Sequence, residues 1–204
     1  MLYLKKIYSW ILSFSDKPSG PKILSFISLI EAIFFPIPPD VLLIPLAIGN
    51  RKKSIIFGIL CSVFSVLGAS LGYFIGSWVW WNSPGEFSTI ANYFFDFVPG
   101  FTHSSFNSIK NLYEEYNFLI IFTAGFTPIP FKLFTISAGS FKINFFLFIF
   151  ASTISRSTRF LLIAFLIKVY GESIRYFIER YFNFLASLFI VILIAGFVLI
   201  KFYL

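Results

Sequence analysis

The sequence has very few of the residues on which disulfides, metal sites and most catalytic centres depend. Its 204 residues include one cysteine, Cys61, and one histidine, His103. A single cysteine excludes an intrachain disulfide, and one Cys with one His cannot build a Cys/His zinc site. No nucleophile–base pair or phosphate-cradling glycine loop stands out either. We therefore expect no metal and no cofactor, and we predict that the chain is not an enzyme.

Charged residues are also scarce. They make up 12% of the chain, and hydrophobic residues make up 58%. A typical soluble domain carries about 25% charged residues. A small domain cannot bury so much apolar surface, because its surface is large relative to its volume. The composition therefore predicts an all-α, polytopic membrane protein with much of its apolar surface facing lipid.

Acidic residues are the rarer charged class, with 9 Asp and Glu against 16 Lys and Arg. The basic residues gather near expected helix ends rather than along one soluble face, which argues against a nucleic-acid partner and favours anionic lipid headgroups. By the positive-inside rule, the N-terminus and the basic cluster 51–53 are expected in the cytoplasm. The segment 82–116 has few basic residues and is expected to be an aqueous loop on the other side. The basic residues at these expected helix ends are Lys5, Lys6, Lys17, Lys22, Arg51, Lys52 and Lys53.

About three stretches are long and apolar enough to span a bilayer, which needs ~20 mostly apolar residues. They lie at 54–81, 143–167 and 182–203. Gly68, Gly72 and Gly76 recur every four residues in the first and predict a helix-packing face. Apolar residues at helical spacing in 1–20 predict an interfacial helix, with an extension of the first membrane helix as the alternative.

Two further apolar stretches, 23–49 and 117–141, are interrupted by proline. Proline removes a backbone donor, and the residue before it avoids the helical region. Each stretch is therefore expected to form two half-helices around a non-helical turn, a re-entrant hairpin that needs protein or a wet cavity around it. The prolines at these breaks are Pro36, Pro38 and Pro39 in the first stretch, and Pro128 and Pro130 in the second.

The two interrupted stretches resemble each other. Residues 34–47 read F-F-P-I-P-P-D-V-L-L-I-P-L-A, and residues 126–139 read F-T-P-I-P-F-K-L-F-T-I-S-A-G. They share a P-I-P core at an offset of 92 residues, although coincidence is an alternative in so biased a composition. Repeat one (22–81) and repeat two (117–170) are thus expected to be inverted copies, a recurring build of transporters. The alignment sets Asp40 opposite Lys132 and predicts that these two charges pair where the hairpins meet.

Five ionisable residues are expected at membrane depth: Glu31, Asp40, Lys132, Arg156 and Arg159. A charge at the bilayer centre costs about 2.5–3.5 kcal/mol on insertion scales, so these groups must pair, face water or bind a ligand. The three bases are candidate phosphate-binding residues, since guanidinium groups suit forked contacts with phosphate. The two acids are candidate proton or countercharge sites. The structural alternative is a static salt-bridge network.

Two of these segments carry a resemblance to a known family. E-A-I-F-F-P-I-P-P-D from Glu31 and A-G-F-T-P-I-P-F-K-L-F-T-I-S-A-G from Ala124 resemble the DedA family of bacterial inner-membrane proteins, whose domain is also called VTT or SNARE-associated. The resemblance covers about residues 25–171. It implies two facing re-entrant hairpins and the movement of lipids such as polyprenyl phosphates across the bilayer, with proton coupling proposed for the family.

The resemblance also implies roles for individual residues. Glu31 and Asp40 match the family's two acidic membrane positions, and Lys132 stands where many members have the second arginine of their hairpin motif. Thr127 occupies the place of the first arginine. Arg156 and Arg159, on the next helix, are candidates to supply the charge missing there.

The leading hypothesis is therefore a flippase-like transporter that moves an anionic lipid, a polyprenyl phosphate or a phospholipid, across a bacterial cytoplasmic membrane. Membrane lipids are the expected partners, and the sequence does not decide between a monomer and a homo-oligomer. The alternatives are a small-ion or solute transporter, or a membrane scaffold or assembly factor without transport.

Overall fold

The computed structural model describes residues 14, 17–97, 102–127, 130–171 and 173. In this part of the chain the structure is all-α apart from one short hairpin of β1 (Trp81–Ser83) and β2 (Glu86–Phe87). Most of the expected N-terminal helix 1–20, the expected membrane helix 182–203 and Pro128 lie outside the described residues.

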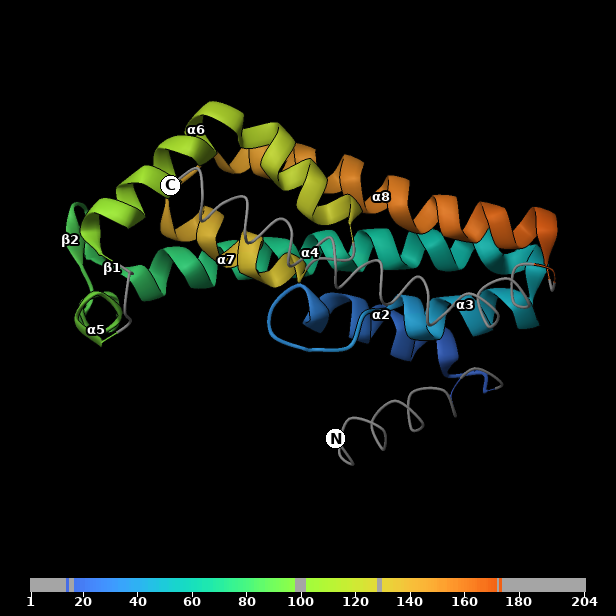
Figure 1. Cartoon of the computed structure of the whole chain (residues 1–204). Coiled ribbons are helices and arrows are strands. Elements are labelled where there is room, and N and C mark those ends of the chain that lie inside the picture. The colour runs from blue at the N-terminus through green and yellow to red at the C-terminus, as the bar shows by residue number, and fades with distance from the viewer. Residues whose placement is uncertain (1–13, 15–16, 98–101, 128–129, 172, 174–204) are drawn as a thin grey trace.

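Two long helices, α4 (Ser54–Trp80) and α8 (Phe145–Tyr170), lie side by side along the molecule (Figure 1). The side chain of Asn144 caps the start of α8 by accepting a hydrogen bond from the Leu147 amide at 3.0 Å, which satisfies an otherwise unpaired helical donor. Among the described residues, the stretches Arg51–Trp80 and Phe145–Tyr170 are long and apolar enough to cross a membrane. They correspond to the expected spans 54–81 and 143–167.

The first proline-interrupted stretch forms α2 (Gly20–Glu31) and α3 (Asp40–Gly49), separated by a non-helical segment 32–39 that we call break one. At its start the carbonyl of Ile30 accepts hydrogen bonds from the amides of residues 33, 34 and 35 at 2.9–3.1 Å. Pro36, Pro38 and Pro39 then prevent the helix from resuming before Asp40.

The second interrupted stretch forms α6 (His103–Phe126) and α7 (Phe131–Ser140). The segment 127–130 between them, break two, begins with Thr127 in an extended conformation (φ −80°, ψ 161°). Pro130 precedes the first helical residue of α7, where a missing backbone donor costs little. Both stretches thus have the expected order of helix, break and helix.

The segment 82–116, expected to be an aqueous loop, is largely helical in its described part, and its position relative to a membrane stays a prediction. It contains most of the β-hairpin, α5 (Thr89–Phe97) and the first half of α6. A short 3-10 helix, η1 (Arg51–Lys53), lies at the opposite end of α4, directly before that helix. Phe106, Ile109 and Tyr113 recur at helical spacing and turn inward, with Phe106 and Tyr113 fully packed, so a polar segment still forms an amphipathic helix. A kink lies at residue 116, where the expected loop ends and repeat two was expected to begin, because Tyr116 has non-helical φ/ψ angles inside α6.

The glycines of α4 mark where both broken helices meet this helix. A Cβ atom at Gly68 would lie 2.1 Å from the carbonyl oxygen of Leu29 in α2, and one at Gly76 would lie 2.0 Å from that of Ile136 in α7. A Cβ at Gly72 would lie 2.5 Å from the hydroxyl of Thr135, also in α7. Small residues let backbones approach this closely. One face of α4 therefore packs closely against both α2 and α7.

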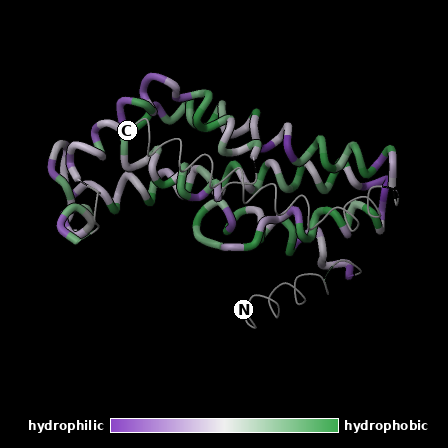
Figure 2. Tube along the Cα trace, in the orientation of Figure 1, coloured by the Kyte–Doolittle hydropathy of each residue, from purple (hydrophilic) through white to green (hydrophobic). Residues whose placement is uncertain are grey.

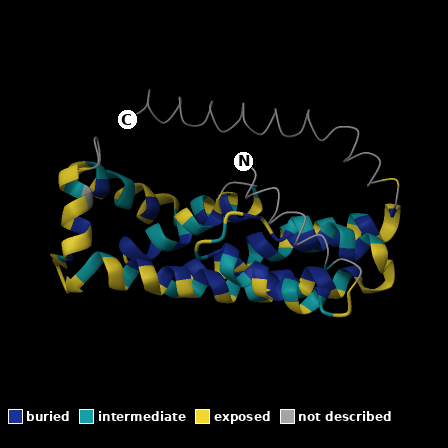
Figure 3. Ribbon diagram, turned by 90° about the horizontal axis from the view of Figure 1, so that it is seen from below, coloured by how far each residue is buried: buried dark blue, intermediate teal, exposed yellow. Residues whose placement is uncertain are grey.

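Buried apolar residues form two clusters, one on either side of the breaks. The first joins α6, α7, the C-terminal half of α4 and the start of α8, and includes Phe131. The second joins α2, α3, the start of α4 and the end of α8, and includes Phe160. Hydrophilic residues gather at the two ends of the molecule, around η1 and around α5 with the start of α6 (Figure 2). Buried residues line the inner faces of the helices (Figure 3).

Candidate functional site

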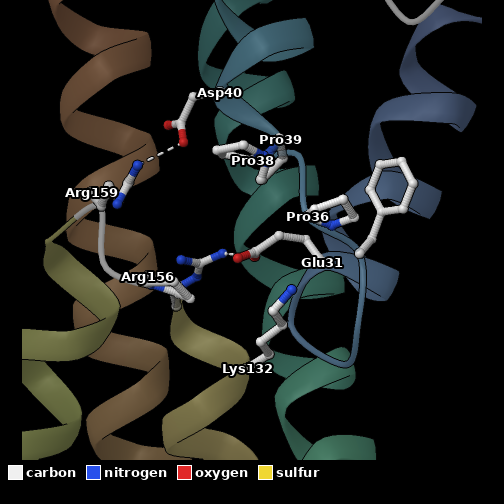
Figure 4. Close-up of a pocket in the computed structure, with 10 residues that line it drawn as sticks. Glu31, Pro36, Pro38, Pro39, Asp40, Lys132, Arg156 and Arg159 are labelled. Carbon is white, nitrogen blue, oxygen red and sulfur yellow. Dashed lines mark hydrogen bonds and ion pairs between the residues drawn. The ribbon is translucent and has the colours of Figure 1, made fainter. Parts of the chain in front are cut away.

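A cavity of about 250 Å³ lies where the two breaks meet α8, between the two apolar clusters. All five charged residues expected at membrane depth line it (Figure 4). The remaining lining residues come from the breaks themselves. They are Phe35, Pro36, Pro38, Pro39 and Pro130.

Arg156 of α8 is the most deeply buried charge of the site, with 2% of its surface exposed. Its Nη2 donates to Glu31 Oε2 at 2.5 Å, and its Nε donates to the Ser65 hydroxyl at 2.7 Å. The guanidinium carbon lies 4.8 Å from the ring centroid of Phe131 and 4.7 Å from that of Phe160. Arg156 is therefore held by a carboxylate, a hydroxyl and two aromatic faces, a setting in which cation–π attraction adds to the ion pair.

Arg159 lies one helical turn further along α8. Its side chain is 13% exposed, close to the 15% of its partner Asp40. Its Nη2 donates to Asp40 Oδ2 at 2.7 Å, and its Nη1 donates to the carbonyl of Thr127 at 2.6 Å. Asp40 is the first residue of α3, where a negative charge is favoured by the helix dipole. The other carboxylate oxygen, Oδ1, is buried and has no hydrogen-bond partner among the described residues.

Lys132 differs from the two arginines. It lies at the start of α7, half-buried at the cavity wall, and its ammonium donates to the carbonyl of Phe34 at 3.2 Å. Among the described residues it forms no salt bridge with an acid. A cation near a helix N-terminus is disfavoured by the helix dipole, and Lys132 is the one base of this site that forms no salt bridge with a described acid.

The cations also satisfy the backbone of the two breaks. Non-helical carbonyls at membrane depth need donors, because lipid supplies none. The Phe34 carbonyl of break one is bound by Lys132 of α7, and the Thr127 carbonyl of break two is bound by Arg159 of α8. The two arginines further hold the two ends of break one, because Glu31 ends α2 and Asp40 begins α3.

The five charges line one cavity beside the breaks, while their depth in a membrane stays a prediction, and one expected pairing is wrong. Asp40 was expected to pair with Lys132, but its partner is Arg159, and Lys132 contacts a carbonyl instead. The physical reason is that Arg159 brings a forked guanidinium from α8 between the two breaks, where it reaches both Asp40 and Thr127.

Sequence reasoning missed three residues that hold Arg156. Ser65 precedes Gly68, Gly72 and Gly76 on the same face of α4, so its spacing was a usable signal for a small polar residue turned toward the site. The ring partners Phe131 and Phe160 carry no such signal, because the chain contains 31 phenylalanines.

The arrangement is suited to binding an anion. Two acids and three bases leave one formal positive charge, and Lys132 is the base that has no carboxylate partner in the described part of the chain. Within the described part of the chain, no group of three or more His, Cys, Asp and Glu side chains is placed to hold a metal ion.

Two relatives share most of their length with this chain. A Haemophilus influenzae protein named "Uncharacterized protein" is 37% identical over 158 residues, which cover 73% of this chain and 72% of the relative. A Histophilus somni protein named "Uncharacterized protein HI0703 homolog" is 32% identical over 183 residues, which cover 87% and 88%. The chain belongs to the family of these two proteins. No protein-family model matches it, and no solved structure does. Neither relative's name states an activity, so the function must be inferred from the site itself.

Proposed function

We propose that this chain is a multi-pass protein of a bacterial cytoplasmic membrane that moves an anionic lipid across the bilayer. Its α2–α3 and α6–α7 segments act as two re-entrant hairpins of an inverted repeat, as in the DedA family that the sequence resembles. The N-terminus and the basic end at η1 face the cytoplasm. The lipid phosphate binds in the cavity between the breaks.

The exposed surface of the long helices supports a membrane location. Only 44% of the most apolar window of Arg51–Trp80 and 33% of that of Phe145–Tyr170 is buried inside the protein. The outer faces carry large apolar side chains such as Leu67, Phe150 and Phe165, each about half exposed. Water would oppose this exposure and lipid would not. Trp78, 75% exposed near the end of α4, suits a membrane–water interface.

The single observation that carries the transport proposal is the cavity with its unpaired Lys132. Ionisable residues inside a membrane are costly and mark substrate pathways when they line a cavity between broken helices. Arg156 and Arg159 are engaged with carboxylates in this conformation. We therefore assign the first phosphate contact to Lys132, with the arginines available only if their carboxylate partners move or take up protons.

The test is lipid translocation in proteoliposomes that contain the full chain and a fluorescent anionic phospholipid. A hydrogen bond to a charged group contributes about 1.5–3 kcal/mol, so Lys132→Gln should lower the rate about tenfold or more. Lys110→Gln is the matched control, because Lys110 lies on α6 away from the cavity and pairs with Glu114 on an exposed face. Unchanged translocation in Lys132→Gln would refute the assignment.

A transporter of small anions is the second candidate, favoured by the size of the cavity. Sites for drug-sized ligands span roughly 300–1,000 Å³, so about 250 Å³ accommodates a phosphate but no lipid chain. A lipid substrate needs its chains to remain in the bilayer. Wild-type proteoliposomes that release trapped inorganic phosphate and leave the fluorescent lipid in place would select this candidate.

A further inference from the structure

Two further cavities lie at the basic end of the molecule. The first, about 520 Å³, is formed by the beginning of α2, the end of α3 and the beginning of α4. Lys17 and Lys53 line it from opposite segments, together with Asn50. Both lysines are exposed, and neither forms a salt bridge with a described residue. Among the described residues, no acidic side chain lines this cavity.

The second cavity is an apolar groove of about 380 Å³ between α2 and α4. Its walls include Phe26, Leu29, Leu60 and Phe64, and Lys22 lies on it. Its one further polar residue, Ser25, donates its hydroxyl to a carbonyl of its own helix at 3.0 Å and offers no free donor to a ligand. The groove therefore fits a hydrocarbon chain rather than a polar solute.

The two cavities adjoin, because Pro21 lines both. Along this path the chemistry changes from two lysines that form no salt bridge with a described acid, one of which (Lys17) lies 4.9 Å from the ring centroid of Phe14, to a groove of aliphatic and aromatic side chains. An anionic phospholipid has the same sequence of chemistry, a phosphate followed by an acyl chain. Anionic headgroups are attracted to basic residues near a membrane surface, and this end of the protein also carries Arg51, Lys52 and Lys168.

We infer that these cavities bind one anionic phospholipid, with its phosphate at Lys17 and Lys53 and one acyl chain in the groove between α2 and α4. The site is separate from the cavity at the breaks and shares no lining residue with it. It needs a membrane around the protein but no transport, so it holds equally for a transporter and a scaffold.

The experiment is native mass spectrometry of the full chain in detergent with phosphatidylglycerol or phosphatidylcholine added. One phosphatidylglycerol should remain bound, with phosphatidylcholine bound more weakly. A lysine near anionic lipid contributes about fivefold in affinity, so Lys53→Gln and Lys17→Gln should each weaken phosphatidylglycerol retention by about that factor. Lys52→Gln is the matched control, because Lys52 is an equally exposed neighbour that does not line the cavity.

A groove variant tests the acyl-chain part. Leu60→Trp should reduce retention of both lipids, with the helical circular dichroism melt showing that the chain remains folded. Equal effects of Lys53→Gln and Lys52→Gln would overturn the headgroup site. If Leu60→Trp leaves lipid retention unchanged and exposes residues 2–13 to protease, the groove holds that segment of the chain and the inference is wrong. Lipid translocation by the Lys53→Gln variant distinguishes this site from the transport proposal. If this variant retains less phosphatidylglycerol but translocates lipid at the wild-type rate, the lipid-binding site is supported and the transport proposal is unaffected.

Discussion

The buried pair of Glu31 and Arg156 provides a quantitative test of how the site is held together. Replacing Glu31 with Leu removes the carboxylate 2.5 Å from Arg156 Nη2 and leaves a guanidinium that is 2% exposed without a partner acid. Replacing Arg156 with Met leaves Glu31, 8% exposed, in the same position. In each case a single charge remains at the wall of the cavity without its ion-pair partner.

The expected cost follows from this burial. Removing one partner of a buried pair typically destabilises a protein by about 3–5 kcal/mol, whereas replacing both partners with apolar residues is often neutral or stabilising. We expect each single variant to lose about 3–5 kcal/mol of unfolding free energy. The double variant Glu31→Leu/Arg156→Met should recover most of that loss, less about 1 kcal/mol for the Ser65 hydroxyl that loses its donor.

The assay is denaturant or thermal unfolding of the purified full chain in detergent micelles, followed by circular dichroism. The matched control is Glu114→Gln, which breaks the exposed Lys110–Glu114 contact at 3.6 Å and should cost less than about 1 kcal/mol. If the single variants lose no more than this control, or if the double variant loses the sum of the two singles, the pair is not a coupled buried unit and the reasoning fails.

Two further predictions concern the helices around the site. Gly76→Ala should cost about 3 kcal/mol in the same unfolding assay, because its Cβ would lie 2.0 Å from a backbone oxygen of α7. The control Gly49→Ala, with no atom within 4 Å of its Cβ, should have little effect. Equal losses would show that α4 and α7 do not pack this closely. Arg51→Gln should speed hydrogen exchange in the last turn of α8 about fivefold, because the Arg51 guanidinium donates to the carbonyls of Lys168 and Val169 at 3.1 Å each, and unchanged exchange would contradict this capping.

Hydropathy and proline positions were sufficient to predict the long helices and both breaks. Proline acts through the local backbone, so its effect on a helix is readable without knowing the neighbours. The first half of α6 was less readable. Its inward residues Phe106, Ile109 and Tyr113 follow helical spacing, but the polar residues between them lower the mean hydropathy and suggested a loop.

The pairing of the charges could not be read from the sequence. The internal repeat correctly brought Asp40 and Lys132 to one cavity, but the repeat says nothing about a third segment that reaches between them. Arg159 lies 119 residues from Asp40 in the chain, and only the packing of α8 against both hairpins makes them partners. Partner choice in such a cluster depends on side-chain reach and on nearby carbonyls, which the fold alone determines.

The structural and transport interpretations of the site make different demands on the same residues. If the broken helices lie in a membrane as proposed, their free carbonyls need donors, and Arg159 meets that need at Thr127 while also pairing with Asp40. Arg156 is likewise fully engaged, so neutralising either arginine damages folding and cannot distinguish the two interpretations. Lys132 can distinguish them, because among the described residues its half-buried side chain makes a single hydrogen bond, of 3.2 Å, and no salt bridge. A purely structural Lys132 would show its loss in the unfolding free energy at unchanged function. A phosphate-binding Lys132 would show it in the translocation rate at nearly unchanged stability.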